Sequence, residues 1–108
     1  MVTLEANKLF RRLSPAELNA LRQITRERTV PAGQEIFKEG ENGDGIYLVK
    51  SGQVEISVNV LPGNRRVFAQ VGPGELFGEM AVLELKPRSA TATAAISSVV
   101  YFIPRAHL

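Results

Sequence analysis

Glycine and proline recur every few positions from residue 29 onward, and β-branched residues fill the intervals between them. Glycine supplies positive φ angles and proline pre-sets one dihedral, so both concentrate in turns. Short β-branched segments bounded by such turns are typical of antiparallel strands. Because no long helix separates the segments, we expect a β-sandwich or jelly roll over about residues 29–104.

The individual strands can be outlined within this region. Residues 46–49 form a fully apolar strand. Along residues 54–60, valine and isoleucine alternate with polar residues such as Ser57. This alternation predicts a strand with one buried face and one solvent-exposed face. The remaining expected elements are the hairpin turn and the later strands, at residues 61–64, 65–71, 89–95 and 97–103.

The N-terminal part of the chain predicts helices. Ser14 and Glu17 have the spacing of a capping box, with Pro15 at the first helical position. Apolar residues then follow at helical spacing and predict a helix that ends near residue 26. These residues are Leu18, Leu21 and Ile24. A shorter helix is expected before it, so that the helical region covers about residues 3–26.

Residues 74–92 hold the chemistry that is most informative about function. Gly78 lets the backbone approach a ligand closely, because it has no Cβ. The apolar run at residues 79–85 predicts a short helix whose first N–H groups are unpaired and electropositive. Arg88 offers a planar fork of donors that suits phosphate oxygens. Glu79 would repel a phosphate, so its expected partner is a sugar hydroxyl. Together these groups predict a site for a phosphorylated sugar.

The segments FGEMAVL (residues 77–83) and PRSATATA (residues 87–94) resemble the phosphate-binding cassette of cyclic nucleotide-binding domains. That family includes regulatory subunits of cyclic-AMP-dependent protein kinase, catabolite activators and gated channels. The resemblance runs through almost the whole chain in the same order and spacing. It implies an antiparallel jelly roll, mainly β with flanking α, that carries N-terminal helices and a short phosphate-binding helix.

The resemblance also implies a role for each candidate ligand-binding residue. The phosphate would contact Arg88, Ser89 and the backbone N–H groups of the turn that contains Gly78. The Arg88 side chain would therefore point into the ligand site and not into the core. Glu79 would accept a hydrogen bond from the ribose 2′-hydroxyl, and apolar residues would flank the base. The full expected set is Gly78, Glu79, Met80, Ala81, Arg88, Ser89, Ile56 and Val71.

Ser89 bears on which nucleotide would bind. Cyclic-GMP-dependent kinases carry threonine at the corresponding place, kinase A regulatory subunits carry alanine, and catabolite activators carry serine and use cyclic AMP. The resemblance therefore favours cyclic AMP over cyclic GMP as the ligand, with no cofactor besides it.

Composition argues against several other functions. The chain has one histidine and no cysteine, so we expect no metal site and no catalytic residues, and we do not expect an enzyme. Its arginines are scattered and its aromatic content is 6%, which does not favour direct nucleic-acid binding. No segment has the length of a membrane span, and we expect a cytoplasmic location.

We expect one domain over residues 1–108, with a C-terminal departure from the family. Members continue into helices that close over the base, whereas residues 103–108 would reach only the start of such a helix. The lid would then be truncated, or supplied by a partner chain. The effector is expected downstream in the native protein or in a partner, and a homodimer is a further option. The alternative function is a member of the same fold that binds no nucleotide and acts as a protein interaction module.

Overall fold

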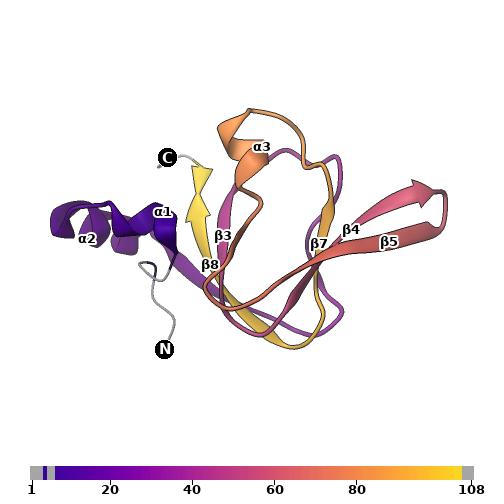
Figure 1. Cartoon of the computed structure of the whole chain (residues 1–108), viewed down its shortest axis with the longest axis horizontal. Coiled ribbons are helices and arrows are strands. Elements are labelled where there is room, and N and C mark those ends of the chain that lie inside the picture. The colour runs from indigo at the N-terminus through magenta and orange to yellow at the C-terminus, as the bar shows by residue number, and fades with distance from the viewer. Residues whose placement is uncertain (1–3, 5–6, 106–108) are drawn as a thin grey trace.

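The computed structural model describes residue 4 and residues 7–105 of the 108-residue chain. Two four-stranded sheets face each other, and two helices cover the outer face of one sheet (Figure 1). The expected helical region from residue 3 and the expected start of a C-terminal helix lie partly outside the described residues. No helix in the described part of the chain is long and apolar enough to cross a membrane.

The first sheet has the strand order β1-β8-β3-β6 and the second has the order β2-β7-β4-β5. Each strand from the first half of the chain therefore pairs with its counterpart from the second half, and the pairs are antiparallel. This nested pairing is a jelly roll, so the expected fold class is confirmed. The strands are β1 (Arg26–Val30), β2 (Glu35–Phe37), β3 (Gly45–Ser51), β4 (Val54–Leu61), β5 (Asn64–Val71), β6 (Leu76–Phe77), β7 (Thr91–Ala94) and β8 (Ser98–Pro104).

Strand β3 is buried on both faces, which explains its run of apolar residues. Tyr47 and Val49 point into the core between the two sheets, where they join aromatic and aliphatic side chains from both. Leu48 lies on the opposite face and packs with Phe10 and Ile103 beneath the N-terminal helices. The central strand of the molecule is thus covered by a sheet on one side and by helices on the other.

Helix α1 spans Lys8–Arg11 and helix α2 spans Pro15–Ile24. The predicted capping box is present: the Ser14 hydroxyl accepts from the Glu17 N–H at 3.2 Å, and the Ser14 N–H donates to the Glu17 carboxylate at 2.9 Å. These bonds lower the pKa of Glu17. Helix α2 ends two residues earlier than expected, because Thr25 has extended dihedrals and β1 already begins at Arg26 to pair with β8.

The expected alternation along β4 is wrong beyond Ile56. Ser57 is fully buried, whereas Val60 is 56% exposed. Strand β4 itself stays regular here, because Ile56 pairs with Ala92 and Ser57 pairs with Thr91 of β7. Ser57 is therefore buried on the face that was expected to be exposed. On the other side, Ile56 pairs with Ala69 but Ser57 pairs with Val67, which leaves one extra residue on β5, and a second irregularity follows between Asn59 and Leu61. Such a bulge changes the side-chain direction on the strand that carries the extra residue, which is β5. The end of this hairpin projects away from the two sheets (Figure 1).

The Ser14 cap gives a direct test of the local stability of α2. We predict that Ser14→Ala lowers the free energy of unfolding by about 1 kcal/mol, because the Glu17 N–H loses the hydroxyl oxygen that accepts its hydrogen bond. Gln23→Ala, at an exposed position of the same helix, should change it little. Thermal and denaturant unfolding of both variants measures the difference. Equal effects of the two substitutions would contradict the assigned role of the cap.

Candidate functional site

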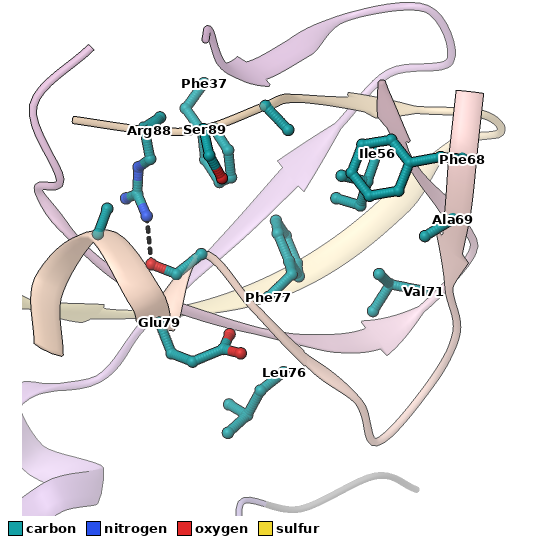
Figure 2. A pocket seen from close by; sticks show the side chains of 13 residues that line it. Phe37, Ile56, Phe68, Ala69, Val71, Leu76, Phe77, Glu79, Arg88 and Ser89 are labelled. Carbon is teal, nitrogen blue, oxygen red and sulfur yellow. Dashed lines mark hydrogen bonds between the residues drawn. The ribbon is translucent and has the colours of Figure 1, made fainter. Parts of the chain in front are cut away.

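A cavity of about 290 Å³ lies between the β4–β5 hairpin and the segments around α3 (Glu79–Leu83) and Arg88. Apolar side chains form most of its wall, and polar groups gather at one end (Figure 2). The lining residues are Phe37, Ile56, Phe68, Ala69, Val71, Leu76, Phe77, Gly78, Glu79, Ala81, Arg88, Ser89 and Ala90.

The turn between β6 and α3 depends on Gly78, which has a φ of +79°. A Cβ on this residue would lie 2.6 Å from Arg88 Nη1 and 3.1 Å from the Phe37 ring. Both the backbone angle and the close contact therefore require glycine. Gly78 also presents its carbonyl oxygen to the guanidinium of Arg88, which donates to it through Nη1 (Figure 2).

Arg88 is held by bonds to segments that are distant in sequence. Its Nη2 donates to Asp44 Oδ1 at 2.9 Å and to the Gly45 carbonyl oxygen at 2.9 Å. Its backbone is fixed as well, because the Arg88 N–H donates to the Glu41 carbonyl oxygen at 2.7 Å and the Gly40 N–H donates to the Arg88 carbonyl oxygen at 2.8 Å. The position of the guanidinium is therefore set by the loop before β3 and by the turn at Gly78.

The guanidinium is almost completely enclosed. The side chain of Arg88 is 1% exposed, whereas that of its ion-pair partner Asp44 is 56% exposed. The guanidinium carbon lies 4.1 Å from the centre of the Phe37 ring and 5.8 Å from that of Tyr47, in cation–π geometry. Arg88 Nε is buried and has no hydrogen-bond partner among the described residues. A buried cation that keeps one unpaired donor is unusual in a folded protein.

Tyr47, a core residue, also contacts Asp44. Burial of its hydroxyl, reinforced by the nearby Asp44 carboxylate, raises the pKa of Tyr47 to about 12. The hydroxyl therefore remains protonated at neutral pH, and it lies 3.4 Å from each carboxylate oxygen of Asp44. Asp44 is thus the shared acceptor of an arginine and a tyrosine.

The cavity brings together nearly all of the residues that the sequence singled out. Gly78, Glu79, Ala81, Arg88, Ser89, Ile56 and Val71 line it. Met80 lies in α3, and the structure describes only its backbone.

One expectation is corrected. We expected the Arg88 side chain to point into a ligand site and away from the core, but it also packs on the core ring of Phe37 and pairs with Asp44. The reason is that Gly78 and the loop before β3 supply acceptors that compensate its buried charge. Substitution of Arg88 must therefore affect stability as well as binding.

Sequence reasoning missed Phe68 and Asp44. Phe68 is the direct neighbour of Ala69, and neighbouring residues of a regular strand point to opposite faces. A regular strand with Ala69 facing the cavity would therefore point Phe68 away from it. Asp44 lies 44 positions from Arg88, and nothing in its local sequence marks the pairing. Among the described residues, no group of three or more histidine, cysteine, aspartate or glutamate side chains could hold a metal ion.

The family described as "Cyclic nucleotide-binding domain" matches residues 27–108 of the chain. This protein belongs to that family. The match includes the whole cavity and every candidate site residue, and it confirms the resemblance read from the cassette segments.

Individual relatives agree with this assignment. The cyclic AMP receptor protein of Thermus thermophilus is 41% identical over 84% of this chain and 42% of its own length. A cyclic nucleotide-gated potassium channel of Mesorhizobium japonicum is 46% identical over 81% of this chain and 22% of its own length. Among solved structures, the regulatory domain of Toxoplasma gondii PKA with cAMP superimposes with a TM-score of 0.89 at 33% identity, and the match covers 95% of this chain and 39% of that one.

The chain spans less than half the length of these relatives. What the family shares is therefore the cyclic nucleotide-binding regulatory domain itself. The remaining parts of the relatives lie outside the matched region.

The close approach at Gly78 can be tested with a matched glycine. We predict that Gly78→Ala and Gly63→Ala both lower stability by about 1–2 kcal/mol from backbone strain, because both residues have positive φ, +79° and +77°. Gly78→Ala should cost clearly more, since its Cβ would displace the Arg88 guanidinium, whereas a Cβ on Gly63 meets nothing within 4 Å. Denaturant unfolding gives both values. If the two variants proved equally stable, the guanidinium contact would not constrain this turn.

Proposed function

We propose that this domain binds a cyclic nucleoside monophosphate in the cavity beside α3, and that binding regulates an effector outside this chain. The observation that carries the proposal is the division of the cavity. A buried arginine with an unpaired donor lies at one end, and apolar side chains form the other. A ligand that fits both ends has an anionic group joined to a flat apolar one.

The phosphate would lie against Arg88 and Ser89. Arg88 Nε offers a donor without a partner, and Ser89 adds a hydroxyl beside it. The backbone N–H groups of the Gly78–Ala81 turn would supply further donors, as in the expected cassette. Asp44 pairs with Nη2 of Arg88, so Nε is the donor that is left for the phosphate.

The ribose and the base would follow towards the apolar end. Glu79 lines the cavity and would accept a hydrogen bond from the 2′-hydroxyl, which keeps its charge away from the phosphate. Ile56 and Val71 would pack against the base. Burial of apolar surface contributes about 25 cal/mol per Å², so this end supplies affinity that does not depend on the arginine.

We propose cyclic AMP as the preferred ligand over cyclic GMP. Serine at position 89 corresponds to the residue that cyclic-AMP-dependent catabolite activators carry, and the similar Thermus thermophilus protein is named as a cyclic AMP receptor. The Toxoplasma gondii neighbour was solved with cAMP.

The signal would pass to an effector in another part of the native protein or in a partner, and a homodimer fits the same role. The relatives include a receptor protein, a kinase regulatory domain and a channel, so the effector is not defined by the domain. We propose that the domain functions in the cytoplasm.

One observation favours a second function. Both terminal nitrogens of Arg88 donate to acceptors within the protein, namely Gly78, Asp44 and Gly45. An arginine whose terminal nitrogens are hydrogen-bonded within the protein can have a purely structural role. The domain would then bind no nucleotide and act as a protein interaction module. Direct titration with cyclic AMP and cyclic GMP separates the two functions, because the interaction module would bind neither.

The phosphate assignment predicts a ranking of three variants. Arg88→Ala should lose roughly 2–5 kcal/mol of binding free energy, because the phosphate loses its charged partner. Arg88→Lys should not restore binding, since an ammonium cannot reproduce the forked contacts. Ser89→Ala should cost about 0.5–1.5 kcal/mol, because it removes one neutral donor. Isothermal titration calorimetry with cyclic AMP measures all three.

Thermal melts must accompany these titrations, because Arg88 is also a core contact. Binding is compared at a temperature where each variant is folded. Loss of binding in a folded Arg88→Lys protein supports the phosphate role. If Ser89→Ala proved as damaging as the arginine variants, the assignment of the phosphate end would be wrong.

The base preference gives a separate prediction. We expect cyclic AMP to bind more tightly than cyclic GMP, but only modestly. The Ser89 hydroxyl can accept a hydrogen bond of about 0.5–1.5 kcal/mol from the guanine amino group, and this bond reduces the difference. Competition binding with both nucleotides measures the ratio. A strong preference for cyclic GMP would contradict the choice of cyclic AMP.

A further inference from the structure

Leu85 has a backbone conformation that leucine seldom adopts. Its φ is +56°, and it is the one residue other than glycine with a positive φ in the part of the chain that the structure describes. This left-handed conformation brings the Cβ close to the following carbonyl oxygen, so glycine usually occupies it. The Leu85 side chain is 72% exposed. Packing of this side chain therefore does little to compensate the strain in its backbone.

The conformation of Leu85 ends helix α3. The Lys86 N–H donates to the Ala81 carbonyl oxygen at 3.1 Å, across the left-handed residue. This bond is that of the Schellman motif, a helix end in which glycine normally occupies the left-handed position. The present chain has leucine there. Helix α3 therefore ends in the geometry of a glycine cap, on a residue that disfavours this geometry.

The segments on both sides of Leu85 are attached to the loop before β3. On the helix side, Ala81 is buried against Gly43, where an added Cβ would come within 3.0 Å of the Ala81 Cβ. On the other side, the Arg88 N–H donates to the Glu41 carbonyl oxygen at 2.7 Å. The chain leaves this loop at Ala81 and returns to it at Arg88, so it must reverse direction within a few residues. Strain at one residue persists where the surrounding structure fixes its conformation in this way.

The two attached segments are also the two parts of the proposed phosphate site. One part is the turn of residues 78–81 with its backbone N–H groups, and the other is Arg88 with Ser89. Both parts line the cavity, whereas Leu85 does not. Figure 2 shows Arg88 beside the helix that carries Glu79. Leu85 therefore joins the two parts, and its strain opposes the arrangement in which both face one ligand.

We propose that Leu85 is a positioning residue that limits the affinity of the phosphate site through the strain in its backbone. The inference rests on the proposed function and concerns a residue outside the cavity. The strained reversal competes with conformations in which residue 85 leaves the left-handed region and α3 moves away from Arg88. A bound phosphate favours the strained arrangement, because only this arrangement brings both sets of donors to it. Apparent affinity falls with the fraction of protein that is already in the binding arrangement.

The test separates the backbone of residue 85 from its side chain. Leu85→Gly should bind cyclic AMP about threefold to tenfold more tightly than wild type, which is part of the factor by which a Cβ disfavours the left-handed conformation. Leu85→Ala is the matched control, because it removes most of the side chain and keeps the Cβ. It should bind within about twofold of wild type. Leu85→Asn should lie between the two, since asparagine tolerates this conformation better than leucine. Isothermal titration calorimetry measures all four affinities.

Two further measurements show where the substitution acts. The gain in Leu85→Gly should be the same for cyclic AMP and cyclic GMP, because the two ligands share the ribose and the phosphate. Without ligand, amide hydrogen exchange in this variant should slow at the Lys86 and Arg88 N–H groups, since the arrangement opens less often. The Leu18 N–H, which donates to the Ser14 carbonyl oxygen in α2, should exchange at the wild-type rate.

Four results would overturn the inference. Equal affinity of wild type and Leu85→Gly would show that the strain does not limit binding. Tightening by Leu85→Ala that matches Leu85→Gly would assign the effect to the side chain. A gain for one nucleotide alone would place the effect at the base. Failure of the wild-type domain to bind either nucleotide would overturn the proposed function as well, and this result is distinguished from the others because it needs no variant.

Discussion

The enclosed guanidinium of Arg88 is the interaction on which the site depends. A cation with a side chain that is 1% exposed is stable only where acceptors compensate its charge, and Asp44, Gly45 and Gly78 supply them. Asp44 and Gly45 lie more than 40 positions from Arg88 in the sequence, Gly78 lies ten positions away, and the Phe37 ring lies against the guanidinium. The Arg88 side chain therefore contacts the β6–α3 turn, the loop before β3 and the core between the sheets.

This arrangement gives the two ends of the cavity different origins. The polar end is fixed by the arginine network, in which glycine at position 78 is required by both its backbone angle and the space it leaves. The apolar end includes residues of the β4–β5 hairpin, where the irregular pairing directs Phe68 to the cavity that Ile56 and Ala69 also line.

The sequence predicted those features that depend on local chemistry. Turn residues at short intervals predicted a β-sandwich or jelly roll, and the Ser14–Glu17 spacing predicted the capping box. The segment from Gly78 to Ser89 predicted the polar end of the cavity. Features that depend on distant partners were not predictable in this way. Strand β1 begins at Arg26 because β8 is there to pair with it. Phe68 turns inward because of a bulge on β5 that the alternating pattern does not reveal, and Ser57 is buried on the face of β4 that the pattern marks as exposed. The pairing of Arg88 with Asp44 likewise follows from the folded topology, not from either local sequence.

The central claim is that Arg88 and the apolar residues of the β4–β5 hairpin mark the two ends of one nucleotide site. Titration of the ¹⁵N-labelled domain with cyclic AMP, followed by NMR, tests it most directly, because the Arg88 Nε–H and the backbone amides report on both ends in one experiment. The account predicts a saturable shift of the Arg88 Nε–H signal as this donor gains an acceptor, together with shifts at residues 78–81 and at the amides of Phe68 and Ala69. Saturable binding that leaves the Arg88 Nε–H signal unchanged, or shifts confined to the separate cavity beside Thr25 and Tyr101, would contradict it.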